Sequence, residues 1–459
     1  MAGKTLQDKI NSIGNPVDML RNAPVGPYIF PVASEFSNWR DEQEAWRKSV
    51  ALLDQSYHMT DLYVEGKDTV RLLSDLGVNS FKGFGRNKAK QLVVCNHDGY
   101  VIGDAVLFGL EDDRVQIVGR PPTENWVEFH ARSGKYDVKV ERDERTLQNS
   151  GQRKTYRLQV QGPLAPQVLE KLNGGPLPEI KFFNMGEIKI RGRTVRALRH
   201  GMPGSPGLEI WGPHEDKEWV REAIMEAGAE FGIRAVGARA YSTVAMESGW
   251  LPSPMPAIYT GDKLQSYRNW LSATSFEASA SLGGSYYSNN IEDYYLTPWD
   301  IGYGHLVKFD HDFIGREALE KMKDAPHRHK VTLSWNSDDV IKVFATYFKA
   351  SDRAKYLDMP GSQYSTLPYD MIMSNGKMVG ISTYPVYTAN GRCWISLSMV
   401  DDAHAATGTE VSVIWGEKDG GSKKPTVERH VQTEIRAVVG PSPYADSARE
   451  NYRPYVLRT

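Results

Sequence analysis

One short pattern occurs twice in this chain, and it constrains the fold more than any other sequence feature. Residues 62–76, LYVEGKDTVRLLSDL, and residues 158–172, LQVQGPLAPQVLEKL, have apolar residues and a glycine at matching places. Alternating apolar residues before the glycine predict a strand, and apolar residues at near-helical spacing after it predict a helix. Two related strand-glycine-helix units indicate a duplicated α+β core.

Three further segments have recognisable patterns. Residues 90–120 contain three β-rich runs separated by turn and charged residues, which predicts an antiparallel meander. Residues 212–232 predict a surface helix with Pro213 near its start and Gly232 at its end. Residues 252–298 are rich in Tyr, Ser and Gly, and we expect this loop-rich insertion to lie beside a site.

The length of the chain and a change of pattern near residue 327 indicate the domain organisation. A chain of 459 residues exceeds one hydrophobic core, so more than one domain is expected. After residue 327 the sequence changes to strands and turns, as in residues 376–400. We therefore assign residues 1–326 to two interleaved α+β domains and residues 327–459 to a C-terminal β domain.

Charge and cysteine content exclude several classes of function. The 55 Lys and Arg residues nearly balance the 57 Asp and Glu residues, so no field would attract nucleic acid. Two cysteines are too few for a disulfide framework and fit a reducing compartment, and the histidines show no metal-ligand spacing. The N-terminus lacks the apolar run of a signal peptide, and no apolar stretch could cross a bilayer. We expect a cytoplasmic protein without a metal or membrane partner; the sequence leaves its oligomeric state open.

A few polar residues could perform chemistry. Asp104 falls on an apolar strand face, where it needs a partner or a purpose; Arg120 could supply an ion pair, or the carboxylate could be functional. Gln55 and His58 could orient a small polar ligand or serve as packing residues. Tyr241 could donate a proton to a phenolate, because both groups have a pKa of roughly 10, or it could be a packing residue.

Residues 294–322, YYLTPWDIGYGHLVKFDHDFIGREALEKM, resemble a stretch found throughout the glycine-cleavage T-protein (aminomethyltransferase) superfamily. The resemblance extends from the first strand unit to the C-terminal β domain. It implies an α+β fold in a three-domain ring, with two related α+β domains and a C-terminal β-barrel-like domain. It also implies tetrahydrofolate in the middle of the ring, accepting a one-carbon unit on N5, with Asp104, Val118 and Glu209 in the folate site.

Within that superfamily, DQSYHMTDLY, VGRPPTENW and ESGWLPSPMPAIYTGDKL look like the bacterial tetrahydrofolate-dependent aryl O-demethylases. Those enzymes remove methyl groups from vanillate, 3-O-methylgallate and syringate during lignin catabolism. The resemblance implies that Tyr241 is the proton donor and that Trp250 lies in the folate site; we expect Arg120, near the departing oxygen, to stabilise its negative charge. It also implies a binding site for a methoxylated aromatic acid, formed by Tyr28, Phe30, Gln55, His58 and Arg120.

This chain departs from the pattern at two places. The phrase HGMPGSPGLE replaces the superfamily's Gly-Tyr-Thr-Gly-Glu phrase before the folate glutamate, so the loop contacts to the pterin are not carried over. Vanillate-type enzymes have a Tyr-x-Tyr pair where this chain has Tyr28, Ile29 and Phe30. The missing hydroxyl makes the pocket less polar and slightly roomier, which predicts a preference for syringate over vanillate.

The sequence therefore predicts a tetrahydrofolate-dependent O-demethylase. It would move the methyl group of a methoxylated aromatic acid to N5 of tetrahydrofolate, giving 5-methyltetrahydrofolate and a phenol. One alternative is a T-protein-like aminomethyltransferase that takes its one-carbon unit from an amine and works with a lipoyl-carrier partner. The other is a folate-binding protein without turnover.

Overall fold

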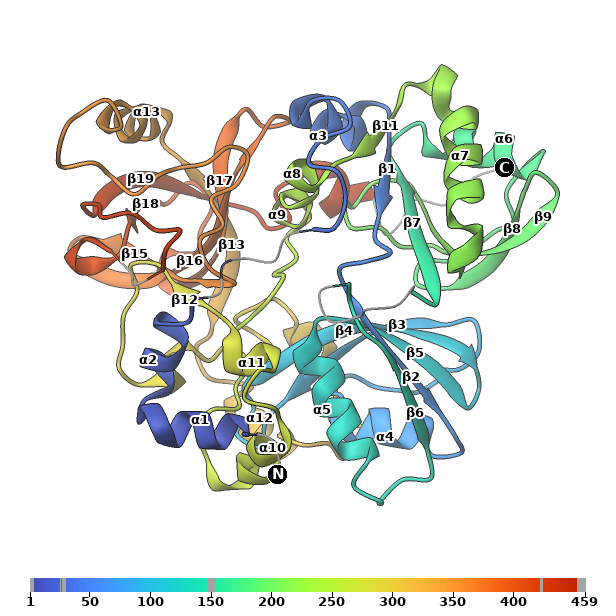
Figure 1. The fold of residues 1–459 in the computed structure, drawn as a ribbon, viewed down its shortest axis with the longest axis horizontal. Helices are drawn as coiled ribbons and strands as arrows, with labels where there is room; N and C mark the ends of the chain where they lie inside the picture. Colours follow the sequence, from blue (N-terminus) through green and yellow to red (C-terminus); the bar gives the residue numbers. More distant parts are fainter. Residues whose placement is uncertain (1–3, 25, 27–29, 147–152, 422–423, 452–459) are drawn as a thin grey trace.

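The computed structural model describes residues 4–24, 26, 30–146, 153–421 and 424–451. Two β-sheets lie one above the other on the right of Figure 1. The first sheet has six strands in the order β11 (Ile233–Val236), β1 (Val50–Asp54), β7 (Thr155–Gln161), β10 (Gly207–Pro213), β9 (Arg193–Leu198) and β8 (Met185–Ile190). In this sheet β1 and β11 are parallel, and the other neighbours are antiparallel.

The second sheet has five antiparallel strands in the order β3 (Ala89–Cys95), β4 (Val101–Glu111), β5 (Arg114–Gly119), β2 (Thr60–Glu65) and β6 (Lys139–Asp143). Strands β3 to β5 form the meander that the sequence predicts. Helices α4 (Thr69–Leu76) and α5 (Pro121–Ala131) pack against this sheet, whereas α6 (Ala165–Asn173) and α7 (Lys217–Gly228) pack against the first sheet.

The C-terminal part of the chain forms a closed barrel, at the left of Figure 1. Its strands follow the order β13 (Arg328–Trp335), β17 (Cys393–Asp401), β16 (Lys377–Thr388), β15 (Asp370–Ser374), β18 (Glu410–Trp415) and β19 (Thr433–Gly440). The short strand β14 (Leu367–Pro368) leaves the barrel region and pairs with β12 (Leu282–Gly283). The predicted fold class, α+β with a C-terminal barrel, is thus confirmed; the boundary at residue 327 stays a prediction.

The remaining helices lie around and between these layers. Helices α8 and α9 occupy the space between the barrel and the first sheet (Figure 1). The bounds are α1 (Leu6–Ile13), α2 (Pro16–Arg21), α3 (Trp39–Lys48), α8 (Ala238–Tyr241), α9 (Val244–Ser248), α10 (Gln265–Trp270), α11 (Phe276–Ser279), α12 (Arg316–Met322) and α13 (Ser337–Thr346). No helix in the described part of the chain is long and apolar enough to cross a membrane.

The backbone of each repeated unit requires a glycine between its strand and its helix. Gly66, between β2 and α4, has φ +145°, and Gly162, between β7 and α6, has φ +143°. A Cβ at Gly66 would lie 2.3 Å from a backbone oxygen, and a Cβ at Gly162 would lie 2.4 Å from the carbonyl oxygen of Ser49. Only glycine fits where the backbone is both left-handed and closely packed. The two units therefore share backbone geometry as well as sequence.

Two sequence-based expectations differ from the structure. Pro213 does not start a helix, because β10 continues through Pro213 in register with Thr155, and α7 begins only at Lys217. The insertion at residues 252–298 lies mostly away from the cavities described below, and Pro252 is its only residue that lines either of them. Most of the insertion packs on the N-terminal helices α1 and α2 and on α5, and four of its tyrosines are core residues: Tyr259, Tyr267, Tyr294 and Tyr295.

Candidate active site

Two adjoining cavities lie where the two sheets, the barrel and α8–α9 meet. The larger has a volume of about 610 Å³ and the smaller a volume of about 50 Å³. Four residues line both cavities: Met59, Arg120, Met202 and Trp250. We call them the large and the small compartment of one site, because a ligand in either one contacts the same four side chains.

Strand order places Gln55 and Tyr241 together in this site. Strands β1 and β11 are parallel neighbours, with Leu53 opposite Val236, so the chain leaves both strands at the same edge. Gln55 follows β1 directly, and Tyr241 ends the short helix that follows β11. The Gln55 amide Nε2 consequently donates a hydrogen bond to the Tyr241 hydroxyl at 2.9 Å.

His58 reaches the same hydroxyl because residues 55–59 cross from the first sheet to the second. Its Nε2 lies 3.0 Å from Tyr241 Oη, and the Phe30 ring packs on both side chains with ring centroids about 5 Å apart. Burial, with a smaller contribution from the Arg120 charge, lowers the pKa of His58 to about 3. His58 is therefore a neutral imidazole at pH 7, and it can accept or donate one hydrogen bond at Nε2.

Tyr241 is a protonated hydroxyl in this environment. Burial raises the pKa of Tyr241 well above its ordinary value, and the hydrogen bond from Gln55 and the Arg120 charge act in the opposite direction. Its ring is 4% exposed, and it lines the small compartment. A phenolic hydroxyl with two polar neighbours, Gln55 and His58, thus belongs to a residue that lines the small compartment.

Arg120 contributes a positive charge to both compartments. It follows β5 and is the N-cap residue of α5, where Pro121 begins the helix. Its guanidinium forms no hydrogen bond or ion pair with any residue that the structure describes. A partly buried guanidinium needs an anionic or polar partner, so this one is suited to bind a group of the ligand.

Asp104 is not paired with Arg120, which excludes the structural ion pair that the sequence left open. Its Oδ2 accepts hydrogen bonds from Gln91 Nε2, Trp250 Nε1 at 3.1 Å and Tyr303 Oη at 3.0 Å. Burial raises the pKa of the Asp104 carboxyl, against the hydrogen bonds that lower it. The other oxygen, Oδ1, has no hydrogen bond within the described ranges, and the residue lines the large compartment.

Glu209 is the second carboxylate of the large compartment. It lies on β10 opposite Gln159 of β7 and accepts hydrogen bonds from Arg157 Nη1 and Gln159 Nε2, both at 2.9 Å. Val118 on β5 and the ring of Trp250 supply apolar surface to the same compartment. Two carboxylates among apolar and aromatic walls suit a flat heterocycle that carries several N–H donors.

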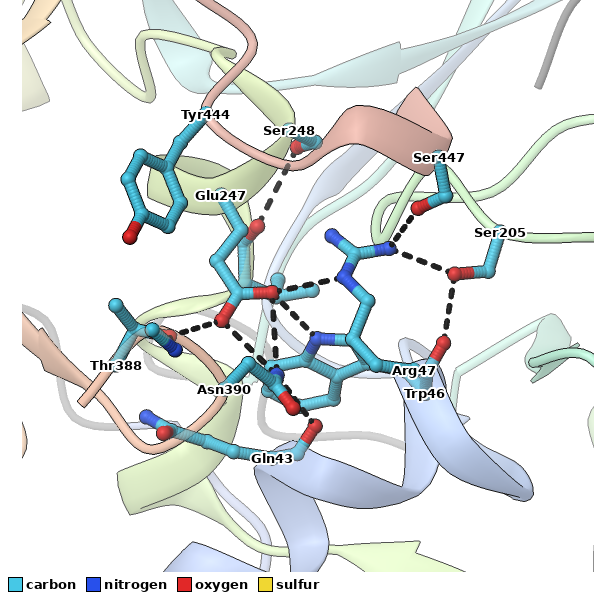
Figure 2. A network of polar contacts seen from close by, with 12 residues as sticks. Gln43, Trp46, Arg47, Ser205, Glu247, Ser248, Thr388, Asn390, Tyr444 and Ser447 are labelled. Carbon is cyan, nitrogen blue, oxygen red and sulfur yellow. Dashed lines mark hydrogen bonds and ion pairs between the residues drawn. The ribbon is translucent and has the colours of Figure 1, made fainter. Parts of the chain in front are cut away.

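Helix α9, which ends two residues before Trp250, is fixed by the buried carboxylate of Glu247 (Figure 2). This carboxylate accepts hydrogen bonds from α3 and from the barrel, through Trp46, Arg47, Thr388 and Asn390. The Arg47 contact is an ion pair of 3.0 Å. One carboxylate thus joins α3, α9 and the barrel beside the site.

Half of the chain matches a known protein family. The sequence model of the GCVT N-terminal domain matches residues 24–253, which is half of the chain. This protein belongs to the GCVT family. Among its relatives, a syringate O-demethylase of Sphingobium sp. is 51% identical over 98% of each chain. A sesamin methylene transferase of Sinomonas sp. is 32% identical, covering 86% of this chain and 85% of its own.

More distant aminomethyltransferases resemble this chain in sequence or in fold. An aminomethyltransferase of Caldanaerobacter subterraneus is 27% identical over 84% of this chain and 86% of its own. The crystal structure of a glycine cleavage system aminomethyltransferase from Bartonella henselae superposes with a TM-score of 0.61, covering 94% of this chain and 98% of the other at 19% identity. That likeness shows the fold of both sheets and the barrel.

The structure brings nearly all the residues expected from the GCVT resemblance to the two compartments. Those in the small compartment are Phe30, His58, Arg120, Tyr241 and Trp250, and those in the large one are Gln55, Asp104, Val118, Glu209 and, again, Arg120 and Trp250. Tyr28 lies outside the described residues. No group of three His, Cys, Asp or Glu side chains in the described ranges could hold a metal ion.

Sequence reasoning missed several lining residues. Gln159 lies directly opposite Glu209, and its position in the second strand-glycine-helix unit could have revealed it. Tyr303 lies in the segment that carries the family resemblance, yet its contact with Asp104 spans 199 residues. The barrel residues Gln363 and Tyr384 gave no sequence signal, because only the tertiary fold brings them to the small compartment.

Proposed function

We propose that this GCVT-family protein is a tetrahydrofolate-dependent O-demethylase acting on a methoxylated aromatic acid, with syringate preferred over vanillate and 3-O-methylgallate. The observation that carries the proposal is the position of Tyr241, which lines a small compartment that shares Arg120 and Trp250 with a compartment of about 610 Å³. The 51% identity to a syringate O-demethylase supports the choice of substrate.

The large compartment fits tetrahydrofolate. Its volume lies within the roughly 300–1,000 Å³ typical of small-molecule sites. Asp104 and Glu209 offer carboxylate acceptors to the N–H groups of a pterin, and Oδ1 of Asp104 forms no hydrogen bond with the residues described. The Trp250 ring would pack beside the pterin where the compartments meet. When bound, tetrahydrofolate supplies N5 as methyl acceptor and leaves as 5-methyltetrahydrofolate.

The chain's own residues would activate the ether. Transfer of the methyl group to bound tetrahydrofolate would break the methyl carbon–oxygen bond and release the N5 proton to solvent, so the departing oxygen would gain negative charge. Arg120 would stabilise that charge, and Tyr241 would donate its proton to the oxygen. Gln55 and the Nε2–H tautomer of His58 would then stabilise the tyrosinate through the hydrogen bonds they make to Oη. Solvent restores the tyrosine proton after the phenol leaves.

The small compartment supports the preference for syringate. Phe30 contributes a ring without a hydroxyl to its wall, against His58 and Tyr241. A second methoxyl group would contact this apolar surface without leaving a polar group of the protein unpaired. We place the reaction in the cytoplasm, because the thiols of Cys95 and Cys393 are both free.

Mass spectrometry of a reaction with tetrahydrofolate and syringate tests the function. We expect 5-methyltetrahydrofolate and the singly demethylated acid in equal amounts, and a higher kcat/KM for syringate than for vanillate. A strong preference for vanillate would contradict the substrate assignment. Methylene-level folate formed from glycine or sarcosine, without reaction of any methoxylated acid, would instead support an aminomethyltransferase.

A further inference from the structure

The C-terminal barrel forms one wall of the small compartment. We propose that Gln363, in this wall, binds the carboxylate of the aromatic acid and makes the enzyme selective for acids over neutral aryl ethers. The inference rests on the proposed function, in which Arg120 and Tyr241 serve the ether oxygen. Gln363 would then recognise the opposite end of the same ring.

The barrel is distorted where it meets this compartment. The register of β16 against β17 shifts between Thr383 and Val386, and Tyr384 at the shift has φ +48°, a left-handed value that bulky residues rarely adopt. Bulges and strained residues of this kind redirect side chains and concentrate at ligand sites. Here the bulge places the buried Tyr384 side chain against the small compartment.

Tyr384 in turn supports the segment that carries Gln363. Its hydroxyl donates a hydrogen bond of 2.6 Å to the carbonyl oxygen of Thr366, and the Thr366 hydroxyl accepts one of 2.7 Å from the Ser281 backbone N–H. Thr366 and Ser365 line the compartment as well. The segment that lines the compartment is therefore fixed at Thr366, three residues after Gln363.

The Gln363 side chain is left available for a ligand. It is half-buried, lines the small compartment and makes no side-chain hydrogen bond to any residue within the described ranges. Partly buried amides are usually hydrogen-bonded, and the two N–H donors of a glutamine amide suit a carboxylate. In contrast, the Thr366 and Tyr384 hydroxyls are already engaged.

The charges around the compartment favour this role. Among its described lining residues Arg120 is the only charged one, since the buried imidazole of His58 is neutral. If Arg120 faces the ether oxygen, the carboxylate, which is meta to that oxygen on the ring, needs a separate donor. Gln363 supplies this donor from the C-terminal domain, whereas Gln55, His58 and Arg120 belong to the two sheets' part of the chain.

Two substrates that differ only in the carboxylate test the inference. We would measure kcat and KM of the full chain with syringate and with 2,6-dimethoxyphenol, at saturating tetrahydrofolate, for wild type, Gln363→Ala and Gln363→Glu. We expect Gln363→Ala to raise KM for syringate roughly tenfold or more, the loss typical of a hydrogen bond to a charged group, with kcat nearly unchanged. The kinetics with 2,6-dimethoxyphenol should change less than about twofold.

The variants control one another. Gln363→Glu should raise KM for syringate further, because the two carboxylates repel each other. Gln167→Ala, on the exposed surface of α6, should have the kcat and KM of wild type. Equal losses with both substrates, or no loss with syringate, would overturn the inference even if the enzyme demethylates syringate. If wild type turns over neither substrate, the proposed function fails. Calorimetric titration with syringate then tests the carboxylate subsite by itself. Weaker binding of syringate by Gln363→Ala than by wild type supports the subsite, and equal or absent binding refutes it.

Discussion

Tyr241 shows how much of the proposed chemistry depends on single atoms. A hydroxyl has one proton and two lone pairs. Gln55 donates to one lone pair, and His58 donates to the other when its proton is on Nε2. The tyrosine proton is then free to point at a ligand. In the other tautomer the tyrosine would donate to His58 instead, so the tautomer of a neutral histidine decides whether the acid faces the substrate.

Replacing Tyr241 with phenylalanine should remove the acid and little else. We expect kcat for syringate to fall by roughly 10²- to 10⁴-fold, the range typical of a positioned general acid, while syringate still binds. Single-turnover kinetics and a binding titration measure the two effects. Tyr356→Phe, which changes an exposed tyrosine of the barrel domain, is the matched control. A near-normal kcat in Tyr241→Phe would remove its role as acid.

The lowered pKa of His58 predicts a specific pH dependence of stability. With a pKa of about 3 in the folded protein and about 6.5 when unfolded, His58 binds a proton only in the unfolded chain between these values. Its contribution is therefore complete above pH 6.5 and is lost as pH falls. Relative to His58→Gln, wild type should lose about 1.4 kcal/mol of unfolding free energy per pH unit below 6.5. Urea unfolding of both proteins at pH 7.5 and 5.0 measures the difference, and parallel curves would contradict it.

At the scale of elements, the two strand-glycine-helix units were the most predictable part of the molecule. Both strands, both glycines and both helices occur where the pattern places them, because alternation, helical spacing and a glycine stop are local signals. The start of α7 was misplaced, since the pairing of β10 with β7 extends that strand through Pro213. Strand β1, four buried residues out of five, was not recognised, although it delivers Gln55 to the site.

Glycine substitutions separate backbone strain from close packing. Gly162 and Gly174, at the two ends of α6, both have positive φ, but a Cβ at Gly174 would meet nothing within 4 Å. We expect Gly174→Ala to cost about 1 kcal/mol of unfolding free energy, the cost of a left-handed alanine. Gly162→Ala should cost clearly more, because its Cβ would also collide with the Ser49 carbonyl. If chemical denaturation gave the same loss of unfolding free energy for both variants, the backbone near Ser49 would have moved away from the new Cβ without cost.

At the scale of the whole molecule, the site exists only where separate parts of the chain meet. Gln55 and Tyr241 follow strands of the first sheet, Asp104 and Arg120 lie on or directly after strands of the second, and Gln363 belongs to the C-terminal domain, before β14. The family resemblance predicted many of the residues that line the two compartments, Tyr241 among them. It could not predict the barrel wall, because a bulge in β16 sets that wall and no periodic pattern encodes it.

Glu247 ties these parts together, so its replacement should affect stability and catalysis at once (Figure 2). Glu247→Gln leaves the Arg47 charge buried without its ion-pair partner, which typically costs about 3–5 kcal/mol. We expect lower unfolding free energy and lower kcat/KM, because Trp250 lies only two residues after α9. Guanidinium unfolding and syringate kinetics test both, with Glu222→Gln on the exposed face of α7 as control. Unchanged stability would exclude the joining role of this carboxylate.

The last described segment has a consequence for how the protein matures. Ser442, Pro443, Ala448 and Arg449 follow the final barrel strand and line the large compartment. A nascent chain emerging from the ribosome can therefore complete both sheets and still lack a wall of its cofactor cavity. Folate capture has to wait until residues 442–449 have been made and folded, so the vitamin cannot template the earlier folding of the two sheets.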